Sequence, residues 1–159
     1  MNKHRHRKHK NNKCDNPIIG SLSIADFYFQ LPNNSVIIPI GKDILFPKNG
    51  PSFGTDIIRI NDFSFNLVSI GIYQILYDIS ITEPGQLIIT LNNKELDYTV
   101  FGRSTGTSQL SGMCLVETLT TNSVLTIRNP SNNLTILTLS ALAGGVNPTS
   151  AHLIISRIK

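Results

Sequence analysis

Cysteine, charged residues and long apolar runs are all scarce in this chain of 159 residues. Its two cysteines, Cys14 and Cys114, are too few for a disulfide framework. No segment approaches the roughly 20 consecutive apolar residues that a membrane-spanning helix requires, so we expect no membrane insertion. The basic start of the chain is followed by polar residues and not by an apolar run, which predicts that no secretory signal peptide is present.

Acidic residues are absent from the start of the chain up to Asp15, and basic residues are concentrated there. Six of the 14 basic residues precede Asp15, namely Lys3, Arg5, Arg7, Lys8, Lys10 and Lys13. The other eight basic residues and the ten acidic residues give the body a net charge of −2, so the net charge of +4 describes the tail. We expect residues 1–16 to be a disordered basic tail rich in His and Asn, and residues 17–159 to be one domain.

Alternation of apolar and polar residues is the main pattern of the body, and residues 71–81 show it best. From Tyr73 to Ile81 every second residue is tyrosine or isoleucine, and polar residues such as Asp78 and Ser80 lie between them. Successive side chains of a strand point to opposite faces, so this segment predicts a strand with one buried face and one mostly polar face. No segment shows convincing helical periodicity, and we expect an all-β fold.

Further short strands are expected along the body, separated by turn residues such as Asn92-Asn93, which tolerate the positive φ of a tight hairpin. Two stretches with turn chemistry, residues 41–54 and 102–112, are predicted to be loops. The expected strands are 27–29, 36–38, 57–60, 63–67, 87–91, 96–100, 113–119, 124–127, 134–138 and 152–158. About ten short strands at this spacing are typical of a β-sandwich.

The order of four segments carries a resemblance to a known family. They are Phe53-Gly54-Thr55, Gly71-Ile72-Tyr73, the hairpin from Leu87 to Asn93, and the terminal run from Ala151 to Ile155. Over about residues 45–159 the chain resembles the TNF-like jelly roll of complement-type globular heads, and more narrowly the C-terminal domain of BclA-like proteins of the Bacillus spore exosporium. The resemblance implies a jelly-roll β-sandwich of about ten strands, a homotrimer and a structural role.

The chain departs from collagen-like exosporium proteins because it has no Gly-X-Y repeat, so no collagen stalk can form. A short-tailed protein remains, located at the spore surface in the exosporium or outer coat, whose trimerisation depends on the head alone. Its expected partners are two further copies of itself and other spore-surface or scaffold proteins. A carbohydrate- or receptor-binding head, such as an adhesin or a viral or phage fibre head, is the alternative. Its natural binding site would be the 102–112 loop with Arg103.

The tail supplies the candidate contact residues. Cys14 follows six cationic side chains that favour its thiolate, which would allow it to form an intermolecular disulfide. The alternative is a free cysteine without a role. The clustered cations Lys3, Arg5, Arg7, Lys8, Lys10 and Lys13 would contact a polyanion, a glycan or a partner protein, or would only keep the tail solvated. Nucleic acid is disfavoured because the tail has no aromatic residue to stack on bases. Neighbouring cations oppose a metal site at His4, His6 and His9.

The body offers little for catalysis. His152 is its only histidine and falls in the last strand, while Ser104, Ser108 and Ser111 lack a nucleophile-elbow pattern. We therefore expect no enzyme activity, no catalytic residues, no cofactor and no metal site. His152 is interpreted as a structural or interface residue, and Cys114 as a small buried hydrophobe.

Overall fold

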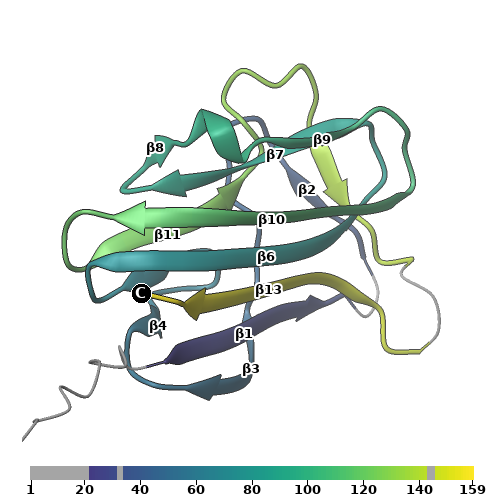
Figure 1. Cartoon of the computed structure of the whole chain (residues 1–159). Coiled ribbons are helices and arrows are strands. Elements are labelled where there is room, and N and C mark those ends of the chain that lie inside the picture. Colours follow the sequence, from purple (N-terminus) through teal and green to yellow (C-terminus); the bar gives the residue numbers. More distant parts are fainter. Residues whose placement is uncertain (1–21, 32–33, 143–145) are drawn as a thin grey trace, which may run out of the picture.

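Two antiparallel β-sheets packed face to face form the part of the chain that the computed structural model describes, residues 22–31, 34–142 and 146–159 (Figure 1). The strands are β1 (Ser23–Gln30), β2 (Val36–Ile38), β3 (Lys48–Phe53), β4 (Ile57–Arg59), β5 (Phe65–Leu67), β6 (Gly71–Ile81), β7 (Gly85–Leu91), β8 (Lys94–Glu95), β9 (Phe101–Arg103), β10 (Ser108–Thr118), β11 (Ser123–Arg128), β12 (Leu137–Leu139) and β13 (Thr149–Arg157). The one helical element in these residues is the short 3₁₀ turn η1 (Asp97–Thr99). No described segment is a helix of the length and apolarity needed to cross a membrane.

The order of the strands within each sheet differs from their order in the chain. In the first sheet β10, β6, β13, β1 and β3 lie side by side, and the short pair of β12 and β2 joins it where Leu139 lies opposite Ile81 (Figure 1). The second sheet has the order β4, β5, β11, β7 and β8, with β9 also pairing with β7. The first and last described strands, β1 and β13, are antiparallel neighbours although they are far apart in the sequence.

The alternation predicted for residues 71–81 is confirmed. Tyr73, Ile75, Tyr77, Ile79 and Ile81 are at most 1% exposed and point between the two sheets. Aliphatic and aromatic side chains from both sheets meet them there, as in the edge-on contact of Tyr77 with Phe101 at 6.3 Å between ring centroids. Full burial of each such side chain contributes about 1.5–3 kcal/mol, so β6 is a main source of the stability of the sandwich.

The tight turn at Asn92-Asn93 is also confirmed, with φ of 51° and 64°. The strand predicted after it, residues 96–100, is wrong, because β8 ends at Glu95 and the chain enters η1. The Thr99 hydroxyl donates to Leu96 O at 2.7 Å and accepts from Ile89 N at 3.0 Å. These side-chain hydrogen bonds replace the ladder that a longer hairpin would have made.

Three other expectations need correction. The predicted 41–54 loop contains strand β3, whose Asn49, Gly50 and Pro51 are accommodated because β3 is an edge strand. The predicted 102–112 loop shrinks to residues 104–107 between β9 and β10.

The third correction concerns the strand predicted at 134–138, which starts later, at Leu137. Leu137 and Leu139 are fully buried, whereas Leu134 is 98% and Ile136 is 45% exposed. Two residues of the predicted alternation, Leu134 and Ile136, therefore lie in the turn before β12.

Strands β6 and β10 approach closely at one point. A Cβ added to Gly112 would lie 2.5 Å from the hydroxyl oxygen of Tyr77, the residue opposite it in the β6–β10 ladder. The buried Tyr77 hydroxyl has no hydrogen-bond partner among the described residues, and burial raises the pKa of Tyr77 far above its ordinary value. Position 112 therefore requires glycine, because the Tyr77 ring occupies the space that a side chain would need.

We expect Gly112→Ala to lower the free energy of unfolding by about 1–3 kcal/mol, because the new methyl group overlaps a fully buried ring. The matched control is Gly102→Ala, whose Cβ would lie 3.0 Å from Cγ of the flexible side chain of Gln86. Urea unfolding of both variants measures the effect. Equal stability of the two variants would contradict the packing described for Tyr77.

The turn between β6 and β7 is tied to β12 by a carboxylate. Glu83 Oε2 accepts from Thr138 N and Glu83 Oε1 accepts from the Thr138 hydroxyl, both at 2.7 Å. Burial alone would raise the pKa of Glu83, but hydrogen bonds from Thr138, from the Thr82 side chain and from the backbone of Glu83 together outweigh burial and lower the pKa below its ordinary value. The folded state therefore favours the ionised carboxylate.

Glu83→Gln is expected to cost about 1 kcal/mol of stability at neutral pH, since it weakens charge-assisted hydrogen bonds in a partly solvated site. A folded-state pKa below the unfolded value gives a contribution that is present above the unfolded pKa and is lost as the pH falls through the folded pKa. Unfolding at a series of pH values should thus show the difference from wild type disappearing in acid. The exposed Glu117→Gln is the control, and a pH-independent difference for Glu83→Gln would refute this assignment.

Candidate functional site

The side of the first sheet that faces away from the core carries a group of exposed apolar side chains. The strand registers place Ile154 of β13, Leu76 of β6 and Met113 of β10 in one row across the sheet. Leu76 is 41% and Met113 is 59% exposed. Water therefore contacts an apolar strip that runs from β13 across β6 to the edge strand β10, a feature that marks interaction surfaces in soluble proteins.

The next row has polar Ser156 and Gln74 in its middle and apolar side chains towards both edges of the sheet. Leu115 of β10 is 54% exposed at one end, and Ile24 of β1 lies opposite the 67% exposed Phe53 of β3 at the other. A hollow of about 270 Å³ lies beside Ile24, Phe53 and Ile154. We call the whole set the outer apolar face; its members are Ile24, Phe53, Leu76, Met113, Leu115 and Ile154.

A polar row borders the outer apolar face. It contains Tyr28 of β1, His152 of β13, Asp78 of β6 and Ser111 of β10, which lie opposite one another in the registers. The imidazole of His152 stacks on the Tyr28 ring with 5.6 Å between the ring centroids, and His152 Nδ1 lies 3.2 Å from Asp26 Oδ1. His152 therefore lies on the sheet surface beside the apolar strip, and its interpretation as a structural or interface residue stays a prediction.

The same row brings a serine, an aspartate and the histidine together without forming a hydrolytic triad. The Ser111 hydroxyl donates to Asp78 Oδ1 at 2.7 Å, so the carboxylate and not the imidazole accepts the serine proton. The His152 side chain is 44% exposed on an open face and lines none of five hollows in the described residues, which range from about 170 to about 610 Å³. A triad requires the histidine between the serine and the aspartate, and a site that excludes water.

The guanidinium of Arg103, proposed above as a ligand contact, is engaged within the protein. Its Nη2 donates to the carbonyl oxygens of Ile81 at 2.9 Å and Glu83 at 3.0 Å, and its Nη1 donates to the carbonyl and hydroxyl oxygens of Ser108. Arg103 thus fastens the ends of β6, β9 and β10 to one another. This use of its donors disfavours the predicted role of the 102–112 segment in binding a glycan.

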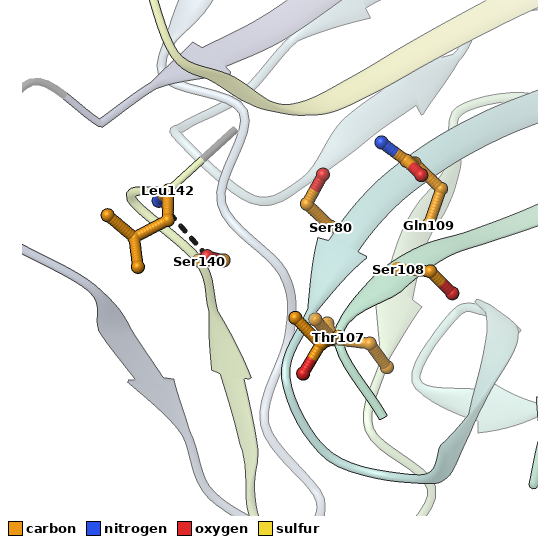
Figure 2. Close-up of a pocket in the computed structure, with 7 residues that line it drawn as sticks. Ser80, Thr107, Ser108, Gln109, Ser140 and Leu142 are labelled. Carbon is orange, nitrogen blue, oxygen red and sulfur yellow. Dashed lines mark hydrogen bonds between the residues drawn. The ribbon is translucent and has the colours of Figure 1, made fainter. Parts of the chain in front are cut away.

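A small hollow lies beside the same segment (Figure 2). It has a volume of about 170 Å³, and hydroxyl or amide side chains of Ser80, Thr107, Ser108 and Gln109 line it. Figure 2 shows Ser140 on the opposite side, where its hydroxyl accepts from Leu142 N at 3.0 Å. No titratable side chain lines the hollow, and its volume is below the about 300–1,000 Å³ of ordinary small-molecule sites.

Cys114 is partly buried in β10, where its Sγ lies 4.0 Å from Thr99 O. Burial raises the pKa of its thiol, so the unreactive protonated form is favoured at neutral pH. Cys14, Lys3, Arg5, Arg7, Lys8, Lys10 and Lys13 lie outside the described residues, as do His4, His6 and His9. Within the described ranges no three His, Cys, Asp or Glu side chains gather as metal ligands would.

Comparison with known proteins gives the fold a wider context. No protein-family model and no curated protein sequence matches the chain. A solved structure of murine APRIL matches with a TM-score of 0.57 at 10% identity, covering 86% of this chain and 98% of that chain. The globular domain of zebrafish complement 1qA protein matches with a TM-score of 0.54 at 12% identity, covering 84% and 94%.

Rabbit GITRL matches with a TM-score of 0.50 at 10% identity and covers 86% of this chain and 94% of that chain. Likeness at such low identity establishes the fold alone. The expected fold class is confirmed: the described body of this chain is an all-β, TNF-like jelly-roll sandwich.

Proposed function

We propose that this chain is a non-enzymatic building block of a surface layer, with a jelly-roll head that associates into a homotrimer through the outer apolar face. The observation that carries this proposal is the exposure of Leu76 on β6 and of Met113 and Leu115 on the neighbouring edge strand β10. A monomer gains nothing from leaving such a strip in water, because burial of apolar surface contributes about 25 cal/mol per Å². Association of identical copies about a closed rotation axis would cover it in each copy.

The surroundings of the strip have the composition expected of an interface. The apolar row lies between polar groups: His152 and Asp78 on one side, and Ser156 and Gln74 on the other. An apolar centre with a hydrogen-bonding rim is typical of interfaces between protein subunits. The order of three is taken from the resemblance of the chain to trimeric jelly-roll heads.

A further part of the proposal concerns the larger structure to which the trimer belongs. We place it at the outer layer of a bacterial spore, the exosporium or outer coat, on the strength of the resemblance of residues 71–73, 87–93 and 151–155 to BclA-like heads. The tail of residues 1–16 would attach the head to other spore-surface or scaffold proteins, through its cations or through a disulfide of Cys14.

Leu76→Glu is expected to convert the trimer into a monomer, because each copy would have to bury an unpaired carboxylate in the interface. Light scattering should give wild-type particles three times the chain mass of 17.5 kDa and variant particles of one chain mass. Leu134→Glu places the same charge at a loop position that is 98% exposed and should remain trimeric. A monomeric wild-type protein, or a trimeric Leu76→Glu variant, would refute the proposed interface.

The proposed tether predicts a separate outcome. Cys14→Ser should allow the protein to be extracted from its assembly without reductant, whereas wild type should require reductant. Cys114→Ser is the matched control, because burial keeps the Cys114 thiol protonated. If wild type and Cys14→Ser are released equally under non-reducing conditions, the disulfide attachment is refuted while the trimer is unaffected.

A further inference from the structure

A recess separate from the two hollows described above has the size of a ligand site. A cleft of about 610 Å³ lies between residues 36–45 and the end of β11, and it shares no lining residue with the outer apolar face. Its walls include Ile37, 60% exposed, Leu45, and Phe63, 40% exposed. A cleft of this volume with apolar walls and a few converging polar groups is typical of small-molecule sites.

The polar part of the cleft is an ion pair between Asp43 and Arg128, each 14% exposed. Arg128 Nε donates to Asp43 Oδ1 at 2.7 Å, and Arg128 Nη2 donates to Asn93 Oδ1 at 2.8 Å. The Thr126 hydroxyl also donates to Asp43 Oδ1, at 2.8 Å. These contacts fix three planar polar side chains from three separate segments before any ligand arrives.

The backbone makes the same region rigid. Ile44 N donates to Ile127 O at 2.7 Å and Gly41 N donates to Asn129 O at 2.9 Å, so the 41–44 segment is bonded to the end of β11. Asn93 is held in the tight β7–β8 turn with φ of 64°. A site on such fixed elements loses little conformational freedom on binding.

Several hydrogen-bonding groups of this cluster are unused. Within the described part of the chain, Arg128 Nη1 and Asn93 Nδ2 make no hydrogen bond, and Asp43 Oδ2 accepts only a 3.3 Å contact from Arg128 Nη2. The cleft therefore presents two donors and one acceptor side by side. A hydroxyl group can both donate and accept, so neighbouring hydroxyls on one ligand would satisfy all three.

The charges around the cleft cancel. Lys42 and Arg128 contribute two positive charges, and Asp43 contributes one negative charge inside the cleft. Glu95 contributes the second negative charge nearby. Asp43 and Glu95 together raise the pKa of Arg128, chiefly through the hydrogen bond that Arg128 donates to Asp43. A free anion would face Asp43 and a free cation would face Arg128, so charge balance favours a neutral ligand.

We infer that this cleft binds a neutral, hydroxyl-rich ligand, namely a sugar unit of a glycan. Adjacent sugar hydroxyls would hydrogen-bond with Asp43, Asn93 and Arg128, while the C–H face of the ring would lie on Phe63. The inference goes beyond the structural role proposed above and does not rest on it, because the outer apolar face contributes no residue to the cleft. It also places carbohydrate binding away from the 102–112 segment.

The test is an NMR titration of the ¹⁵N-labelled full chain with the methyl glycosides of glucose, galactose, mannose, rhamnose and N-acetylglucosamine. At least one of them should give saturable shifts, with a millimolar dissociation constant, at the amides of Asp43, Asn93 and Arg128. Asn93→Gly keeps the positive φ of the turn but removes the carboxamide of the side chain. This variant should bind the glycoside about tenfold more weakly. Inorganic sulfate should leave these amides unchanged.

The matched control is Asn92→Gly, at the neighbouring position with φ of 51°. The Asn92 side chain accepts from Val124 N at 2.8 Å and does not line the cleft, so affinity should stay within about twofold of wild type. The inference is overturned if no glycoside gives local, saturable shifts, if Asn93→Gly binds as wild type does, or if sulfate saturates the same amides. None of these outcomes depends on whether the protein is trimeric.

Discussion

The strict alternation of side chains along β6 is the constraint on which the rest of this structure depends. Its odd-numbered residues from Tyr73 to Ile81 are sealed between the sheets, so its even-numbered residues must face outward. The strand pairs with β10 over its full length and with β13 over residues 73–79. A slip of one residue would bring Gln74 and Asp78 into the core, and the large cost of such burial fixes the register.

The outward residues of β6 then determine what the first sheet presents to its surroundings. Leu76 lies between Ile154 and Met113, so the apolar residue that separates Gln74 from Asp78 on the outer face of β6 completes an apolar row across three strands. In a monomer this row remains in water. The proposed association of copies would bury it, and the cleft around Asp43 and Arg128 would stay available for another ligand.

Much of the fold could be predicted from the sequence because burial imposes a period of two. The pattern of residues 71–81 and the Asn92-Asn93 turn are read from adjacent residues, and both are confirmed. The edge strand β3 was missed because an edge strand tolerates Pro51 and Gly50. The buried face of β12 was assigned to the wrong residues, because Leu134 and Ile136 are apolar but exposed.

The candidate sites were harder to predict, for a different physical reason. The outer apolar face assembles one or two residues from each of five strands, and only the register brings them together. Asp43 and Arg128 are 85 positions apart and carry no local motif. The sequence instead drew attention to Arg103, whose hydrogen bonds to Ile81 and Glu83 could not be inferred from local pattern.

Hydroxyl-radical footprinting of Met113 across a range of protein concentrations measures whether the outer apolar face is covered by other copies, because a thioether reacts rapidly wherever water reaches it. Association through the outer apolar face predicts that Met113 is protected at concentrations where the chain associates and becomes reactive on dilution, while the loop residue Leu134 reacts equally throughout. If Met113 is oxidised at the same rate at all concentrations, as expected for its 59% exposure in a single chain, the outer apolar face is not an interface.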